Sequence, residues 1–511
     1  MFSAMNLEFV DWVVIVGYMF VILLVGLICS RKNTSTEEYF VGNRRFPGWI
    51  IGLSLVGTSI SSITFLAYPG DAYKTSWLRF VPNTMLPVAV LIAAYCFLPF
   101  FRRERITSAY EFLEQRFGPS VRVYGAFAFM FGQIVRISMI LYLVSLMLHE
   151  ITGLSVLFCI VIGGLFVSFY TVLGGIDAVI WTDVMQTLIL LAGGVACYWV
   201  IVEALPGGLS QILSVAENHG KLSLSELNNG KLHSVSWDWS LDKKTIPMML
   251  LIGLSAWLTE YSSNQNVIQR YCASKSSAEA RKAMLVCVLS SLPIWAFYMF
   301  LGTCLFVFFQ QFPTLPATEM LTGSQSAEQI LPYFIVHNMP SGFAGLVIAA
   351  ALAAAMSSLD SSINAIATVW VVDIYRRHLK PAKSDRHYLH VAWLMASIIG
   401  LFMIIGAFYL SNTTGKTLQH TATILVSLLT GGMLGLYLLG FFTHKTGTTA
   451  VWFGIVATML FTGWTVLSSN GLLPDFASVP FDLYYTGLIG NVIMFVVAYS
   501  FGLRFHAAKN T

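Results

Sequence analysis

Long apolar runs, each about the length of a membrane crossing, recur along the whole chain with short polar segments between them. A helix needs about 20 mostly apolar residues to cross a bilayer. The pattern therefore predicts an all-α membrane protein of about thirteen transmembrane helices, near 9–29, 48–68, 83–101, 120–148, 153–172, 178–203, 246–268, 282–310, 330–373, 389–410, 418–442, 448–468 and 483–503. The ninth segment is too long for one crossing, so we expect a short helix before the span.

The composition agrees with this class of protein. Hydrophobic residues make up 56% of the 511 residues and charged residues 11%, whereas a soluble domain is about one quarter charged. This excludes an ordinary soluble enzyme, and the abundance of apolar residues excludes a disordered chain. The seven cysteines have no metal-binding or disulfide spacing. No ATP-binding or metalloprotease motif is present, so we expect no enzyme and no use of ATP, and neither nucleic acid nor an obligate protein partner is indicated.

The distribution of basic residues predicts the orientation. If the N-terminus is outside, only seven of the 29 basic residues fall in outer segments: Lys74, Arg79, Lys221, Lys231, Lys243, Lys244 and Lys416. Arg136 lies inside the fourth span, and the other 21 fall on the opposite side. Cytoplasmic loops carry the excess of lysine and arginine. We therefore predict a multi-pass protein of the plasma membrane, with the N-terminus outside and the C-terminus in the cytoplasm. The longest hydrophilic segment, 204–245, is then outside and should form short helices starting at 209–216.

The second span carries an unusual density of hydroxyl groups. Residues 57–64 read GTSISSIT, with five hydroxyls in eight positions. These hydroxyls could bond to carbonyls of their own helix or mediate helix packing. Alternatively, the helix is interrupted here, which would free backbone carbonyls to hold an ion or line a cavity.

The ninth span carries small and polar residues on one face. At 100° per residue, Ala354, Ser357, Ser358, Ser361 and Asn364 form one stripe. Serine oxygens are hard ligands for a small cation, but two hydroxyls are too few for sodium, and carbonyls from a broken second span would complement them. Asp360 points away from this stripe, so we expect it to pack or pair on another face.

Two charged residues inside spans need partners. Arg136 stays protonated and must find an anion. This anion is either Glu260 or Asp183 in a structural ion pair, or the carboxylate of a substrate, which a guanidinium binds through two hydrogen bonds. Asp183 either is a helix-start acid favoured by the helix dipole or serves a functional site.

At these residues the sequence resembles the sodium:solute symporter family. The matching segments are 174–186 (GGIDAVIWTDVMQ), 264–271 (NQNVIQRY), 353–361 (AAAMSSLDS) and 373–375 (DIY). The resemblance covers nearly the whole chain. It implies a leucine-transporter-like fold of two inverted five-helix repeats, 48–203 and 246–442, with one extra N-terminal span at 9–29 and two extra C-terminal spans at 448–503.

The resemblance also implies ligand sites. A sodium site would use carbonyls of Gly57, Ile60 and Ala354 with hydroxyls of Ser357 and Ser358. Gly57 stands where alanine is common, which should be harmless because only its carbonyl is needed. Family members that use a second sodium have an acidic residue at the place of Asp183, beside Ser357 and Ser358, so two sodium ions per cycle are expected.

Within the family, residues 132–136 (GQIVR) resemble the sialic acid symporters, whose arginine grips the sugar's carboxylate. By that likeness Arg136 binds the substrate, and Ser59, Ser61, Thr64 and Asn83 line the polar side of the pocket. The leading hypothesis is sodium-coupled uptake of a sialic acid of the N-acetylneuraminate class by alternating access. The alternatives are another organic anion such as a monocarboxylate or pantothenate, a neutral sugar, and, from other classes, a membrane receptor or a channel.

Overall fold

The computed structural model describes residues 7–31, 33–103, 106–228, 231–412, 430–444 and 446–507. Its α-helices are α1 (Phe9–Ser30), α2 (Thr36–Val41), α3 (Gly48–Ser59), α4 (Ser62–Lys74), α5 (Leu86–Ile92), α6 (Leu98–Arg103), α7 (Ala109–Phe117), α8 (Pro119–Thr152), α9 (Val156–Ala204), α10 (Gly208–Asn218), α11 (Ile246–Ser263), α12 (Gln265–Ala273), α13 (Ser277–Gln311), α14 (Leu315–Thr322), α15 (Ile330–Asn338), α16 (Phe343–Val369), α17 (Asp385–Asn412), α19 (Met433–Phe442), α20 (Thr448–Ser469) and α21 (Thr486–Ala507).

Short helices of other geometry connect some of these elements. They are the 3₁₀ helices η1 (Gly42–Arg44), η2 (Leu78–Met85), η4 (Ala327–Gln329), η6 (Asp475–Ala477) and η7 (Leu483–Tyr485), and the π-helices η3 (Ala93–Phe97) and η5 (Trp370–Leu379). Two strands, β1 (Ser225–Asn228) and β2 (Lys231–Ser234), pair antiparallel as a hairpin.

Among the described residues, nine helices are long and apolar enough to cross a membrane, and the bent pair α3 and α4 makes a tenth. The predicted all-α class is therefore confirmed, while the number thirteen stays a prediction. The difference has identifiable causes. The fifth and sixth predicted spans form the single element α9, the seventh is divided into α11 and α12, and the eleventh, 418–442, includes residues 418–429, which lie outside the described residues.

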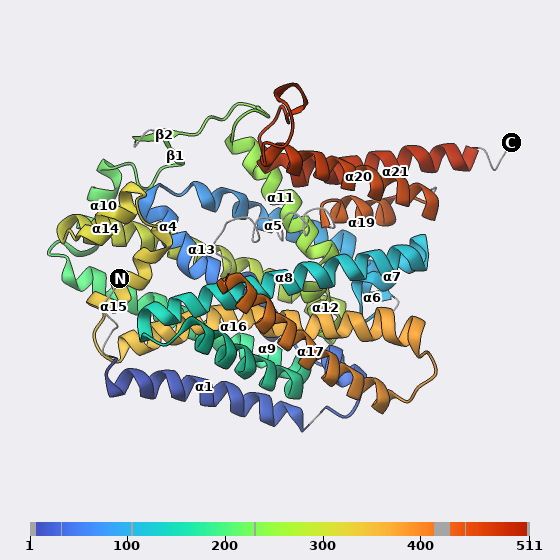
Figure 1. Cartoon of the computed structure of the whole chain (residues 1–511), viewed down its shortest axis with the longest axis horizontal. Coiled ribbons are helices and arrows are strands. Elements are labelled where there is room, and N and C mark those ends of the chain that lie inside the picture. The colour runs from blue at the N-terminus through green and yellow to red at the C-terminus, as the bar shows by residue number, and fades with distance from the viewer. Residues whose placement is uncertain are drawn as a thin grey trace.

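The long helices run broadly side by side, with α1 along one edge of the bundle and α20 and α21 along the opposite edge (Figure 1). In the same view α1 starts at the end where α10, α14 and the hairpin lie, and α21 finishes at the end where α7 lies. Helix α16 occupies the centre: 83% of the most apolar window of α16 and η5 is buried, against 28% for α1. As expected, the short helix α15 precedes it.

Three helices are interrupted at single residues. Helices α3 and α4 meet at an angle of 56°, because the backbone leaves helical geometry at Ile60 (φ −98°, ψ 112°). Helices α11 and α12 are divided in the same way at Asn264 (φ −82°, ψ 115°). Within α9 the break is at Gly175, which has a φ of 58°, a left-handed conformation that glycine adopts readily because it has no Cβ atom. A straight helix of 49 residues would be about 73 Å long, more than twice the hydrocarbon thickness.

The extra helix α1 holds the start of α16 in place. The Oδ1 atom of Asp11, a buried side chain, accepts hydrogen bonds from the backbone N–H groups of Gly342 at 2.8 Å and Gly345 at 2.7 Å. A Cβ atom at Gly345 would lie 2.6 Å from the carbonyl oxygen of Asp11, so the two backbones touch there. These bonds satisfy N–H groups that a helix start leaves open.

The segment 204–245 contains the predicted helix, as α10, and also the β1–β2 hairpin, which was not predicted. This segment covers the end of α4. The Nζ atom of Lys221 donates to the carbonyls of Tyr73 (2.7 Å), Lys74 (3.2 Å) and Thr75 (3.2 Å) and lies 4.2 Å from the centre of the Phe306 ring. Lysine 221 therefore caps the open carbonyls at the C-terminal end of α4. Burial lowers the pKa of Lys221 to about 7.

Candidate substrate and sodium site

The break after α3 creates a place where backbone carbonyls lack helical partners. The last helical hydrogen bond of α3 runs from the N–H of Ile60 to the carbonyl of Val56 at 2.9 Å, so the carbonyl of Gly57 lies beyond it. Glycine 57 packs against α9: a Cβ atom there would lie 3.1 Å from both the Asp183 carbonyl and the Thr187 hydroxyl. Glycine at this position therefore lets α3 approach α9 more closely than a larger residue would, since a Cβ atom would force these neighbours to move.

The polar stripe of α16 is buried in the centre of the bundle, and α3 packs against this helix. Ser357 donates through Oγ to the carbonyl of Ala354 at 3.2 Å, so three predicted sodium ligands lie on one turn. The hydroxyl of Ser358 is buried and has no hydrogen-bond partner among the described residues. A buried polar atom without a partner is uncommon and indicates a missing ligand or water.

Asp183 is fully buried in an ion pair with Arg270 of α12. Nη2 of Arg270 donates to Oδ2 of Asp183 at 2.6 Å and to Oγ of Ser361 at 2.7 Å, while its Nε donates to Oγ of Ser54 at 2.7 Å. The Ser54 hydroxyl itself donates to Asp183 at 2.6 Å. This cluster joins α3, α9, α12 and α16. The interpretation of Asp183 as a helix-start acid is wrong, since Asp183 lies within α9 and pairs with a cation. Its Oδ1 atom has no hydrogen-bond partner among the described residues.

Arg136 is half-buried and makes no ion pair or hydrogen bond with any residue that the structure describes. The two predicted structural partners are engaged elsewhere. Asp183 pairs with Arg270, and Glu260 accepts a hydrogen bond from the side chain of Asn264 at 2.8 Å. The alternative of a structural ion pair with Glu260 or Asp183 is therefore wrong within the described chain.

The remaining predicted substrate residues come from two places, the break between α3 and α4 and the helix η2. Ser59, Ser61 and Thr64 flank the break between α3 and α4, and the last two are buried. Asn83 of η2 is buried and donates through Nδ2 to the hydroxyl of Tyr68 on α4 at 2.5 Å. This bond ties η2 to α4, the second part of the broken helix. The structure shows no hydrogen bond from Arg136 to any of these residues.

One turn before Arg136, the side chain of Gln133 connects α8 to two other helices. Its Oε1 atom accepts from the Ser362 hydroxyl at 3.0 Å and from Nδ2 of Asn266 at 3.4 Å. Asp360 lies away from the stripe, as predicted: its Oδ2 accepts from the hydroxyls of Tyr170 (2.8 Å) and Thr182 (3.2 Å) on α9.

Two cavities lie along α8, one on either side of Arg136. The first, here called the α7-end cavity, has a volume of about 790 Å³ and includes Arg122 among its lining residues. The second, the α15-end cavity, has a volume of about 560 Å³ and includes Leu143. At 1.5 Å per residue, Arg136 lies about 21 Å from Arg122 and about 10 Å from Leu143 along the helix. Along α8, Arg136 therefore lies between the two cavities.

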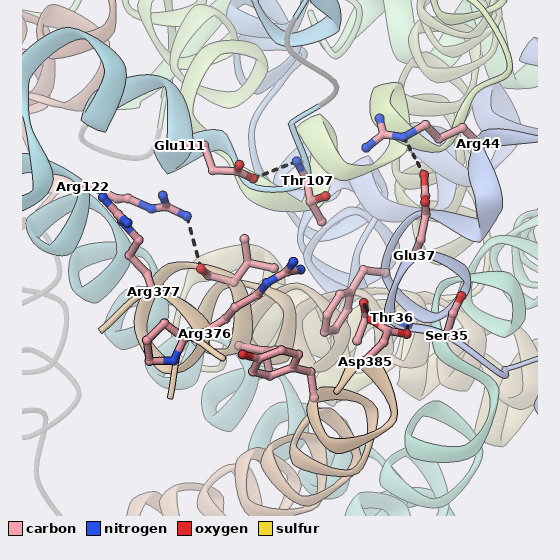
Figure 2. Close-up of a pocket in the computed structure, with 15 residues that line it drawn as sticks. Ser35, Thr36, Glu37, Arg44, Thr107, Glu111, Arg122, Arg376, Arg377 and Asp385 are labelled. Carbon is pink, nitrogen blue, oxygen red and sulfur yellow. Dashed lines mark hydrogen bonds and ion pairs between the residues drawn. The ribbon is translucent and has the colours of Figure 1, made fainter. Parts of the chain in front are cut away.

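Charged side chains line the α7-end cavity, and among them Arg44 forms an ion pair with Glu37 (Figure 2). Arg122 binds Glu114 of α7 at 2.5 Å and Asp373 of η5 at 2.6 Å, and Arg377 binds Glu114 at 2.7 Å. Although partial burial acts in the opposite direction, hydrogen bonds from Arg377 and Arg122 lower the pKa of Glu114. These contacts join helices from distant parts of the chain at this end of the bundle.

The role of Arg270 was not predicted, because this residue was counted with a basic loop. Its side chain is in fact buried, with 1% of its surface exposed. The available signal was the polar run at 264–271, directly after an apolar segment. Every residue of α12 is buried, so this polar segment is inside the protein. The chemistry that the cluster offers is oxygen-rich: a carboxylate, several hydroxyls and free carbonyls suit a hard cation such as sodium.

Comparison with known proteins agrees with this arrangement. The sodium:solute symporter family profile matches residues 39–461. The chain is 35% identical over 453 residues to the sodium/sialic acid symporter SiaT of Proteus mirabilis, covering 88% of each, and 31% identical over 500 residues to the sodium/sialic acid symporter NanT of Aliivibrio fischeri, covering 97% of this chain and 94% of the relative.

The structural comparison gives the same result. A solved substrate-bound, outward-open sodium-coupled sialic acid symporter superposes with a TM-score of 0.86 at 32% identity, covering 97% of this chain and 98% of that one. The nucleobase-cation symporter Mhp1, with a TM-score of 0.52 at 14% identity, shares the fold. The leucine-transporter-like fold is thus confirmed, and the chain is a multi-pass sodium-dependent transporter rather than an enzyme. It belongs to the sodium:solute symporter family.

Proposed function

We propose that this protein couples inward sodium movement to uptake of a sialic acid by alternating access. The observation that carries the proposal is Arg136, a half-buried guanidinium with no anion among the described residues, located between two cavities. A substrate carboxylate would supply the missing anion through two charged hydrogen bonds. The two sialic acid symporters that match over most of the chain support this choice of anion.

The polar residues near the break would bind the rest of the sugar. Ser59, Ser61, Thr64 and Asn83 offer neutral hydrogen-bonding groups, which hydroxyls and an acetamido group require. We propose these four residues and Arg136 as the substrate site. Another organic anion, such as a monocarboxylate, would use the same arginine but would leave most of these groups unused.

We propose one sodium site formed by the carbonyls of Gly57, Ile60 and Ala354 and the hydroxyls of Ser357 and Ser358. Its support is the interrupted helix α3 and the buried, unpartnered Ser358 hydroxyl. A second sodium would bind Asp183 beside Ser357 and Ser358, and the free Oδ1 atom of Asp183 supports this. Two sodium ions with one monoanion move a net charge of +1, worth about 2.3 kcal/mol per 100 mV.

We also propose the division into two inverted repeats, 48–203 and 246–442. Its support is that each begins with a helix broken at one extended residue, Ile60 or Asn264, with similar backbone angles. Four arginines line the α7-end cavity, Arg44, Arg122, Arg376 and Arg377. These basic residues support an orientation with the α7 end, and with it the C-terminus, in the cytoplasm and the N-terminus outside.

The test is uptake by the reconstituted protein of a panel of labelled acids and sugars, with and without a sodium gradient. Sodium-driven accumulation of the sialic acid is expected. The Arg136→Gln variant should bind the acid orders of magnitude more weakly, because hydrogen bonds to charged groups are worth about 1.5–3 kcal/mol each. Arg136→Lys should recover only part of this loss.

A double-mutant cycle tests direct contact. The neutral amide of the sialic acid should bind the wild type poorly but lose little more in Arg136→Gln, because the charged pair is already absent. If the two losses are independent and additive in a folded variant, Arg136 does not bind the carboxylate.

A further inference from the structure

The α15-end cavity has walls that differ from those of the proposed substrate site. It lies between α4, α8, η4 and α15, and its volume of about 560 Å³ falls in the range of sites for small organic ligands. Most lining residues are apolar, among them Leu66, Leu143, Met147, Ile151 and Val336. A sugar acid in this cavity would lose water from its hydroxyl groups and find few replacement partners.

The walls of the cavity are held together closely. At Gly70 of α4, a Cβ atom would lie 2.7 Å from the carbonyl oxygen of Ala327 in η4, so these two backbones are in contact. Asn83 and Tyr68 join η2 to α4 by the hydrogen bond described above. The cavity is therefore formed before any ligand binds, which lowers the entropic cost of binding.

The charges at the cavity are unbalanced toward negative. The ionised residues among its described lining are Arg79 and Glu328. Arg79 forms an ion pair with Asp71 and lies 5.7 Å above the ring of Tyr68. Glu328 accepts a hydrogen bond from the Ser326 hydroxyl and has no ion pair with a described residue. Because Arg79 pairs with Asp71, Glu328 is left without a cationic partner among the described residues, and the three groups together carry a net charge of −1.

We propose that the α15-end cavity is a second binding site, for an amphipathic organic cation with an apolar body and one ammonium group. The apolar body would contact the walls formed by Leu66, Leu143 and Met147. The ammonium would lie beside Glu328, where it balances the excess negative charge. An anion would be opposed by the same charge, so this ligand differs in class from the proposed substrate.

Occupancy of the cavity would obstruct transport. Leu66 and Ala67 line it two and three residues after Thr64 on α4, so the cavity adjoins the proposed substrate site. A ligand there would hold α4 against α15 and close the approach to Arg136. This consequence rests on the proposed function, whereas binding of the cation does not.

Three molecules with one apolar body test the proposal: N,N-dimethyl-3,3-diphenylpropylamine, 3,3-diphenylpropanol and 3,3-diphenylpropionate. Their binding to the full-length protein in lipid nanodiscs is measured by calorimetry, with empty nanodiscs subtracted. The amine should bind more tightly than the alcohol, and the acid most weakly. Glu328→Gln should weaken the amine about two- to fivefold, the size expected for a partly exposed ion pair, and leave the alcohol unchanged.

Two controls locate the site. Glu217→Gln removes an exposed carboxylate on α10 at the same end of the bundle and should change nothing. Leu143→Gln, which makes the wall polar, should weaken both the amine and the alcohol. Arg136→Gln should leave binding of the amine intact, which separates this site from the proposed substrate site even if the protein transports no sialic acid.

Several results would overturn the proposal. Equal affinity of the amine for the wild type and for Glu328→Gln would show that the Glu328 carboxylate does not bind the ammonium. Unchanged binding in Leu143→Gln would show that the ligands do not bind in this cavity. Tightest binding by the acid, lost in Arg79→Gln, would make this an anion site instead.

Discussion

The ion pair between Asp183 and Arg270 leads to a prediction in which its two partners act in opposite directions. If Asp183 binds the second sodium ion, the guanidinium of Arg270 competes with that ion for the same carboxylate. Arg270→Met should therefore strengthen sodium binding, although it removes a residue from the core of the protein. Asp183→Asn should weaken it, because a neutral amide replaces the charged ligand.

The structure sets the size of the first effect. Arg270 makes four hydrogen bonds of 2.6 or 2.7 Å, to Ser54, Asp183, Ser361 and the carbonyl of Asn266. Removing one partner of a buried ion pair costs about 3–5 kcal/mol, because the other charge stays buried without compensation. Sodium bound to the unpaired carboxylate would recover part of this loss: at a concentration 100 times its Kd, a ligand stabilises the folded state by about 2.7 kcal/mol.

Thermal unfolding in detergent measures both effects, with sodium replaced by choline at constant ionic strength. Without sodium, Arg270→Met should unfold at a lower temperature than the wild type, and sodium should raise its midpoint by more. The double variant Asp183→Asn/Arg270→Met should regain stability but lose the larger sodium effect. Arg122→Met is the matched control, since Arg122 also pairs with a buried carboxylate, that of Asp373, and lies about 21 Å along α8 from Arg136.

An equal sodium shift in the wild type and in Arg270→Met would refute the reasoning. The same conclusion would follow if Arg122→Met showed the larger shift too, because the effect would then be a general response of a destabilised protein. In either case Asp183 would be a structural partner of Arg270 and would not bind sodium.

Three further predictions concern other parts of the chain. Ser357→Ala or Ser358→Ala should each raise the sodium concentration for half-maximal uptake by removing a hard oxygen ligand; unchanged sodium dependence in both would exclude this site. Asp11→Ala should lower the free energy of unfolding by about 2–4 kcal/mol, since two buried N–H groups lose their acceptor, as denaturation in detergent would measure. Burial lowers the pKa of Lys221 from 10.5 to about 7. Between these two values the lysine is protonated when the segment 204–245 is detached from α4 and mostly neutral when the segment is packed on it. Packing of this segment should therefore strengthen as the pH rises from 7 toward 10. Hydrogen exchange in β1, corrected for its intrinsic rate, would show this as slower opening, and Lys221→Met should remove the dependence.

Hydropathy predicted most of the fold because a membrane requires long apolar segments, and these are visible in any sequence. The break at Ile60 was foreseeable from the hydroxyl cluster around it. The break at Asn264 was not predicted, because residues 246–268 were interpreted as one span although residues 262–266 (SSNQN) are polar. The β1–β2 hairpin was missed because it lies outside the membrane pattern, in a segment judged by its polarity alone.

The candidate site was predictable residue by residue but not in its pairing. Arg136 and Asp183 stood out as charges within apolar spans, and each needed a partner. Arg270 lies close to a basic loop in the sequence and was counted as part of that loop. Its side chain is instead buried inside the bundle on α12. Only the three-dimensional arrangement shows that Asp183 pairs with a cation, whereas Arg136 has no anionic partner among the residues that the structure describes. That difference determines which of the two is available to a substrate.

The contact between α1 and α16 also has a consequence in time. The partners of Asp11, Gly342 and Gly345, follow it by 331 and 334 residues. At a synthesis rate of about 5–20 residues per second, they emerge roughly 15–65 s after Asp11. Helix α1 is thus the first helix of the described chain to be made. The N–H groups that donate to its Asp11 carboxylate are made only after most of the other helices. The bonds between Asp11 and the start of α16 are therefore a late step of assembly, formed after α1 could already pack on α9.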